Sequence, residues 1–450
     1  MITDLSEVSA NIRAAKLDGN TRLNLSCGLT ALPNEVYDLA DTLEILDLSG
    51  NLLSSLPDDF YRLHKLRVLF CSDNQFERLP EVLGQCTQLT MVGFKANQIC
   101  EVPAASLGKS LRWLILTDNK IRELPPEIGQ CTHLQKLMLA GNQLQTLPLE
   151  MAACHSLELL RIAANRFTEL PNWLLTLPRL SWLAYAGNPC CENHESSALL
   201  HNPIAEIDWQ KLRIQQKLGE GASGVIHHAR WQQADGVEVD VAVKLFKGSM
   251  TSDGLPHSEK TACISAGAHP NLIAIHGKIV DHPTGSTGLI MDRIASTFHN
   301  LAGPPSLDSC TRDIYADDTK FTLESVLSIA KGIAAAALQL HNKGIMHGDL
   351  YAHNIMRNNE GVCLLGDFGA ASFFSPDDHP HALALQRIEV RAWGCLLEEL
   401  LARCTAEGQH DACLASLVIL QADCVVPNVA ARPLFSKILQ TLNALQINGG

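Results

Sequence analysis

The first half of the chain repeats one pattern of apolar and polar residues. A stretch of spaced leucines, such as Leu43-x₂-Leu46-x-Leu48, precedes an asparagine that recurs every 22 or 23 residues. The series is Asn51, Asn74, Asn97, Asn119, Asn142, Asn165 and Asn188. A hydrophobic-Pro pair follows each of the first six. The pattern predicts one short strand per repeat, with the asparagine buried at the turn and hydrogen-bonded to backbone groups of its own and the neighbouring repeat.

This pattern resembles the leucine-rich repeat family. The resemblance implies an α/β solenoid over residues 22–192, preceded by an N-terminal cap over residues 1–21. Strand positions that point away from the leucine core align in a largely apolar column on the concave face: Ile45, Val68, Met91, Trp113, Lys136, Leu159 and Trp182. We expect this column to be exposed and to bind a protein substrate or regulator. The expected contacts are Met91, Trp113, Leu159 and Trp182. Contact with the chain's own second half is the alternative.

The second half has a different organisation. After a linker over residues 193–211, alternation around residues 212–214 and 225–227 predicts a hairpin, and residues 241–244 and 289–292 predict further strands. Residues 258–266 and 322–342 predict helices, residues 296–320 a polar surface insertion, and Glu389 the start of another helix. One domain is therefore expected over residues 212–447.

The chemistry of this domain centres on Asp349, Asn354 and Asp367. Phosphoryl transfer from a nucleotide needs a carboxylate that orients and deprotonates the acceptor hydroxyl, and oxygen ligands that hold Mg²⁺ on the phosphates. Asp349 fits the first role. Asn354 and Asp367 fit the second, because both supply the hard oxygen that Mg²⁺ prefers.

The chain before these residues supplies a nucleotide-binding half in the matching order. Gly219, Gly221 and Gly224 occupy the predicted hairpin, where glycine lets the backbone approach phosphates closely. Lys244 ends the next strand, at the position of a lysine that contacts the α- and β-phosphates, and Glu259 in the following helix would anchor it.

Taken in order, these landmarks resemble a eukaryotic-type protein kinase domain. The expected fold class is a leucine-rich-repeat solenoid followed by a two-lobed α+β kinase-like domain. The resemblance implies ATP and Mg²⁺ as cofactors, with Lys244, Asp349 and Asn354 catalytic and Phe368 stacked near His347. The implied nucleotide contacts are Gly219, Gly221, Gly224, Val225, Ala242, Lys244, Glu259, Met291 and Met356.

The chain departs from the kinase pattern at several places. Gly348 replaces the arginine that precedes the catalytic aspartate and would receive an activation-loop phosphate. Tyr351 and His353 stand where the family carries its Lys or Arg. Only nineteen residues separate Gly369 from Glu389, and no Ala-Pro-Glu occurs among them. Arg432 therefore lacks its usual carboxylate partner, for which Glu389 is a candidate.

Composition limits the location and the partners. The net charge of −13 argues against binding to nucleic acid or to an anionic membrane surface. The fifteen scattered cysteines suggest reduced thiols in the cytoplasm, and no run of 18 apolar residues predicts a membrane span. We also expect His341, His379 and His381 to face solvent or cap helices rather than to bind metal.

Three functions remain open at this stage. The leading hypothesis is an ATP-dependent protein kinase, serine/threonine-directed because that class is the commoner one. A small-molecule phosphotransferase of the aminoglycoside or choline kinase type would suit the short activation segment. A pseudokinase scaffold is the third, although the retained Lys244, Asp349, Asn354 and Asp367 favour catalysis.

Overall fold

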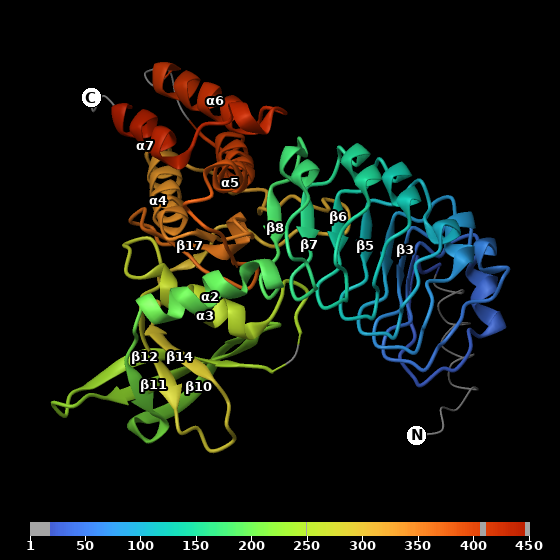
Figure 1. Ribbon diagram of the computed structural model, residues 1–450, viewed down its shortest axis with the longest axis horizontal. Coiled ribbons are helices and arrows are strands. Elements are labelled where there is room, and N and C mark those ends of the chain that lie inside the picture. Colours follow the sequence, from blue (N-terminus) through green and yellow to red (C-terminus); the bar gives the residue numbers. More distant parts are fainter. Residues whose placement is uncertain (1–18, 249, 406–410, 446–450) are drawn as a thin grey trace. The chain divides into compact units, whose positions relative to one another are not determined.

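The computed structural model describes residues 19–248, 250–405 and 411–445, so the predicted cap over residues 1–21 lies almost wholly outside the described residues. The chain forms two compact units, Met1–Leu177 and Pro178–Gly450 (Figure 1). The division falls inside the predicted repeat region, and Trp182 and Asn188 belong to the second unit.

The first unit is a stack of parallel strands in chain order, as predicted for leucine-rich repeats (Figure 1). The strands are β1 (Arg22–Asn24), β2 (Ile45–Asp47), β3 (Val68–Phe70), β4 (Met91–Gly93), β5 (Trp113–Ile115), β6 (Lys136–Met138) and β7 (Leu159–Arg161). Short 3₁₀ helices connect them: η1 (Asn34–Leu39), η2 (Phe60–Arg62), η3 (Glu81–Gln85), η4 (Ala104–Ser106), η5 (Pro126–Gln130), η6 (Leu149–Ala153) and η7 (Asn172–Thr176).

The recurring asparagine links each repeat to the one before it. Asn97 accepts a hydrogen bond from the Phe76 amide (3.0 Å) and donates to the carbonyls of Cys71 (3.0 Å) and Phe94 (3.2 Å). The side chain is 4% exposed, so these bonds satisfy a buried amide. The predicted role of the asparagines is confirmed.

The predicted column is aligned, but its expected exposure is wrong. Val68, Met91 and Trp113 are in register on neighbouring strands, yet Met91 is 2% and Leu159 4% exposed. Parallel strands lie about 4.8 Å apart, so side chains in register cover one another. The Lys136 ammonium, for example, lies 4.4 Å from the centre of the Trp113 ring.

The second unit begins with strand β8 (Trp182–Ala184) and helix α2 (Pro189–His201), followed by a six-stranded sheet in the order β10-β11-β12-β14-β13-β9. Helix α3 (Pro256–Ala266) lies beside α2 (Figure 1). The sheet consists of β9 (Glu206–Asp208), β10 (Leu212–Glu220), β11 (Gly224–Gln232), β12 (Glu238–Phe246), β13 (Ile275–Val280) and β14 (Gly288–Asp292), with η8 (Trp209–Lys211) after β9. The predicted hairpin and strands are present.

The rest of the second unit is mainly helical. Its helices are α4 (Leu323–Asn342), α5 (His379–Leu401), α6 (Asp411–Val425) and α7 (Phe435–Ala444), with η9 (Ala352–Asn354) and η10 (Val429–Ala431). Short strands β15 (His299–Asn300), β17 (Ile355–Arg357) and β18 (Cys363–Leu365) form one sheet, and β16 (Ile345–Met346) pairs with β19 (Ser372–Phe373). Helix α4 is long and apolar enough to span a membrane, but its apolar face packs against α5, α7 and β18 as a core helix does.

Two sequence expectations need correction here. Helix α5 begins at His379, ten residues before the predicted start at Glu389, with Pro380 in its first turn where the missing amide costs nothing. The insertion over residues 296–320 is not purely a surface loop. Cys310 is fully buried, and the Tyr315 hydroxyl donates to Glu399 of α5 (3.2 Å).

The buried carboxyl of Glu399 generates a prediction on stability. Burial raises its pKa to about 7. Between pH ~4.5 and ~7 the folded protein therefore keeps a proton that the unfolded chain has lost, and its free energy of unfolding falls as the pH rises. Glu399→Gln should remove this fall, which is on the order of 3 kcal/mol. The measurement is the urea midpoint at pH 5 and pH 7.5.

Glu398→Gln is the matched control, because the side chain of Glu398 is 56% exposed next to the buried Glu399. We expect it to keep the wild-type dependence on pH. Equal dependence in the wild type and Glu399→Gln would contradict this account of Glu399.

Candidate active site

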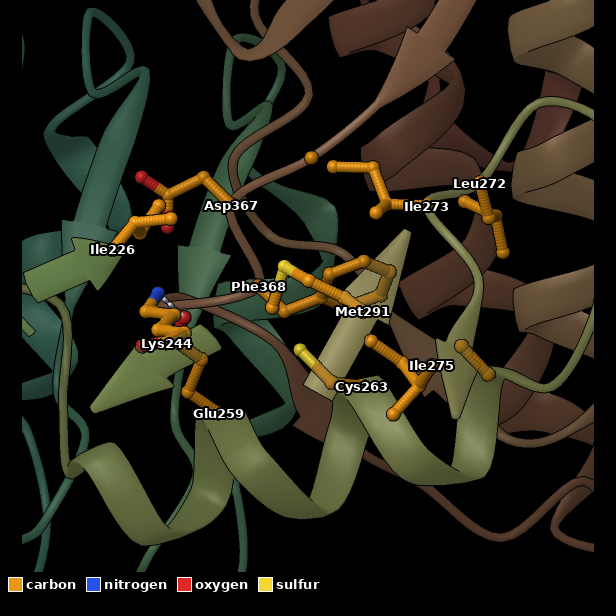
Figure 2. Close-up of a pocket in the computed structure, with 12 residues that line it drawn as sticks. Ile226, Lys244, Glu259, Cys263, Leu272, Ile273, Ile275, Met291, Asp367 and Phe368 are labelled. Atoms are coloured by element: carbon orange, nitrogen blue, oxygen red, sulfur yellow. Dashed lines mark hydrogen bonds and ion pairs between the residues drawn. The ribbon is translucent and has the colours of Figure 1, made fainter. Parts of the chain in front are cut away.

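A buried ion pair connects the sheet of the second unit to helix α3. The Lys244 ammonium on β12 bonds the Glu259 carboxylate on α3, as expected from the sequence (Figure 2). Glu259 is 1% exposed. Burial raises the pKa of Glu259. At Lys244 burial acts to lower the pKa, but Glu259, Cys263 and Asp367 together outweigh it, so the pKa of the lysine is raised. This buried ion pair thus connects strand β12 to helix α3 inside the unit.

A cavity of about 90 Å³ opens beside this pair. Figure 2 shows Lys244 and Asp367 at one end and apolar side chains from α3, β13 and β14 around the rest. The lining residues are Ile226, Lys244, Glu259, Cys263, Ala266, Leu272, Ile273, Ile275, Met291, Gly366, Asp367 and Phe368. An apolar cavity with a few convergent charges is typical of a small-molecule site.

The predicted nucleotide contacts are only partly gathered at this cavity. Met291 lines it, and Ala242 lies opposite Met291 on the neighbouring strand. Met356 lies on β17 and is not among the residues that line the cavity. Sequence reasoning missed the apolar walls Ile226, Ile273 and Ile275, which carry no signal beyond ordinary strand alternation.

The glycine loop joins β10 and β11, with Val225 directly after it on β11. A Cβ added at Gly219 or Gly221 would meet nothing within 4 Å, so the backbone there faces open space. At Gly224 a Cβ would lie 2.6 Å from the Leu245 carbonyl oxygen. Gly224 is therefore needed for close strand packing, whereas Gly219 and Gly221 leave room for a phosphate to approach the backbone.

Asp349 and Asn354 are joined directly. The Asn354 amide nitrogen donates to the Asp349 carboxylate (2.7 Å) and to the Asp349 carbonyl (2.9 Å). The side-chain oxygen of Asn354 is then the atom left to bind a cation. Asp367 is exposed, and its Oδ1 accepts a hydrogen bond from the Gly369 amide (3.1 Å). One carboxylate and one amide oxygen fit Mg²⁺, which keeps several waters and phosphate oxygens as its other ligands.

Glu389 of α5 fixes the loop that carries Asp349. This carboxylate accepts hydrogen bonds from the Gly348 amide (2.7 Å) and from His341 Nε2 (2.7 Å). Burial alone would raise the pKa of Glu389, but His341, His347 and the Gly348 amide together lower it below its ordinary value. The expectation that His341 faces solvent is wrong, because His341 is 2% exposed.

Arg432 does not pair with Glu389, which was its candidate partner. Its guanidinium donates instead to the carbonyl oxygens of Val426 (3.0 Å), Arg387 (3.2 Å) and Pro178 (2.7 Å). Burial lowers the pKa of Arg432 to about 10. Carbonyl dipoles thus replace the missing carboxylate.

Phe368 and His353 complete the surroundings of the loop. The Phe368 ring lies 5.0 Å from the His347 ring, as expected. His353 Nδ1 lies 2.7 Å from Asp313, and the His353 amide donates to the same carboxylate (3.0 Å). Asp313 belongs to the insertion, and sequence reasoning missed it because a single acidic residue in a polar loop gives no signal.

Comparison with known proteins supports both resemblances. Residues 212–395 match the family described as protein tyrosine and serine/threonine kinase, and residues 42–63 and 109–167 match two leucine rich repeat families. Ephrin type-B receptor 3 of Danio rerio is 30% identical over 175 residues, or 39% of this chain and 32% of that protein. Ephrin type-A receptor 8 of Mus musculus is 24% identical over 280 residues, or 53% of this chain and 27% of that protein. The chain thus spans about a third or less of these relatives.

The ion pair generates a prediction. Glu259→Gln leaves Lys244 buried without its counter-charge, which should lower the free energy of unfolding by about 3 kcal/mol and weaken nucleotide binding. Glu206→Gln is the matched control, since Glu206 pairs with Lys278 (2.8 Å) at the surface, where its side chain is 62% exposed. Glu206→Gln should lower the free energy of unfolding by less than about 1 kcal/mol. Urea unfolding of both variants is the measurement, and equal costs would contradict the account.

Proposed function

We propose that this chain, in which leucine-rich repeats precede a protein kinase domain, is an ATP-dependent protein kinase. The observation that carries the proposal is the gathering of charged groups in the second unit. Lys244, Glu259 and Asp367 line one cavity, and Asn354 donates a hydrogen bond to the Asp349 carboxylate (2.7 Å). A lysine, a metal-binding pair and a carboxylate base are the groups that phosphoryl transfer needs.

Each group has a distinct task in the proposed reaction. Lys244, oriented by Glu259, binds the α- and β-phosphates of ATP, while the open backbone at Gly219 and Gly221 lies over them. Asp349 orients the acceptor hydroxyl and accepts its proton. Asn354 and Asp367 would hold Mg²⁺, which supplies positive charge to the phosphates when bound. Most of the rate gain would come from positioning and charge stabilisation.

The acceptor and the partner belong to the same proposal. We propose serine or threonine as the acceptor because that class is the commoner one, although the matched family covers tyrosine as well. The repeat unit would bind the substrate or a regulator, as such repeats usually do, with the partly exposed Trp113 as an anchor. The fifteen cysteines, all of them among the described residues, form no disulfide, which supports a cytoplasmic location.

A small-molecule phosphotransferase is the second candidate. Helix α5 begins ten residues after Gly369, so little chain is left to form a peptide platform between them. This observation favours a small acceptor. The match of residues 212–395 to a protein kinase family favours the first proposal.

The test compares transfer with binding. Asp349→Asn should lower the transfer of label from radiolabelled ATP to the chain itself or to a protein mixture by a factor of at least ~10², and leave ATP binding intact. Asp367→Asn should abolish the Mg²⁺-dependent part of ATP binding. Asp377→Asn, which changes an exposed aspartate of the same segment, is the control and should behave as wild type.

Filter retention measures the label, and acid hydrolysis identifies the acceptor residue. Bound Mg²⁺-ATP without transfer to protein would favour the small-molecule candidate or a scaffold. Failure of the wild type to bind ATP would overturn the enzyme proposal.

A further inference from the structure

The start of the second unit, residues 178–201, lies against the catalytic loop of that same unit. Trp182 of β8 stacks flat on Tyr351, with ring centroids 4.1 Å apart and planes 8° from parallel. Its indole N–H donates to the Leu350 carbonyl (3.1 Å). Trp182 is 2% exposed, so at this residue the structure fits the alternative expectation of contact with the chain's own second half. Tyr351, on which Trp182 stacks, lies two residues after Asp349 in the chain.

The same segment accounts for Gly348. This residue has φ +73°, and a Cβ placed on it would lie 2.7 Å from the Leu183 carbonyl oxygen and 2.5 Å from that of Ala370. An arginine at this position would clash with both backbones. Residues 178–201 can therefore approach the loop this closely only because glycine replaces the arginine.

Two further departures from the kinase pattern also meet this segment. The Ser372 hydroxyl of the short activation segment accepts hydrogen bonds from the amides of Tyr185 (2.9 Å) and Ala186 (3.1 Å). Arg432, which has no Ala-Pro-Glu partner, donates to the Pro178 carbonyl (2.7 Å). Arg391 of α5 donates to the Ser181 hydroxyl (2.6 Å). Ser372 is fully buried and so is not placed to receive a phosphate.

The segment also reaches the helix that carries Glu259. One oxygen of Glu195 on α2 accepts from the Gly187 amide (3.0 Å), and the other accepts from the hydroxyl of Ser258 (3.4 Å). Ser258 directly precedes Glu259 on α3, and α2 packs along α3. Residues 178–201 therefore contact both the loop that carries Asp349 and the helix that orients Lys244.

We infer that residues 178–201 are a built-in replacement for the activation segment, and that Trp182 is a positioning residue which holds the catalytic loop in its assembled form without phosphorylation. The inference rests on the proposed kinase function for its catalytic part. Its structural part, the support of residues 345–357 by Trp182, stands independently of activity.

The experiment uses the full chain with Trp182→Ala, Trp182→Phe and Trp113→Ala. Trp182→Ala should speed amide hydrogen exchange across residues 345–357 at least ~10-fold, because the loop loses its cover. It should also lower kcat ~10-fold while the Kd of Mg²⁺-ATP stays within about twofold, since nucleotide contacts are untouched. Trp182→Phe, which keeps a stacking ring, should recover most of both losses.

Trp113→Ala removes a tryptophan from the repeat unit and should leave exchange in residues 345–357 unchanged. Unchanged exchange in Trp182→Ala would overturn the inference. A rise in kcat in that variant would also overturn it, because the segment would then be an inhibitor. If the wild type transfers no phosphate, the proposed function fails, and the exchange result alone still decides whether Trp182 supports the loop.

Discussion

The Glu389 carboxylate, buried beneath the catalytic loop, is the interaction on which the site depends. It binds the Gly348 amide and His341 together, so the loop before Asp349 is tied to both α4 and α5. A charged acceptor makes a stronger hydrogen bond than a neutral one, and losing one partner inside the protein leaves a buried charge unsatisfied. Asp349 takes its position from this tie, Asn354 bonds Asp349, and the groups proposed to act on ATP follow from that arrangement.

Residues 178–201 also pack against this loop. Kinases that carry an arginine before the catalytic aspartate can use a phosphate to order the activation segment. Here that position is Gly348, and the carbonyl of Leu183 occupies the space that a side chain would need. Flat stacking of Trp182 on Tyr351 supplies order by packing, which requires no modification. A site held between a buried carboxylate and a packed indole is expected to be assembled as soon as the chain has folded.

The sequence predicted the two folds and most residues of the candidate site, and what it did not predict has physical causes. The asparagine period revealed the repeats because each repeat must satisfy the same buried turn. Ordered motifs predicted the match of residues 212–395 to a protein kinase family. The pairing of Asp313 with His353 could not be predicted, and contact of Trp182 with the second half was foreseen only as an alternative without its partner Tyr351, because each pair joins residues far apart in the chain. Trp182 occupies the same strand position as in the preceding repeats, but it packs against Tyr351 of the second unit. The departures at Gly348, Tyr351 and Arg432 looked like separate losses, but one segment meets all three.

The most direct test of this account is an experimental structure of the full chain with Mg²⁺ and a non-hydrolysable ATP analogue. The account predicts the analogue's phosphates between the Gly219–Gly221 backbone and Asp367, near Lys244, with Trp182 still stacked on Tyr351. An empty cavity at saturating analogue would contradict the proposed site. Bound analogue with Trp182 displaced from Tyr351 would contradict the role of residues 178–201 as a support and would make them a lid.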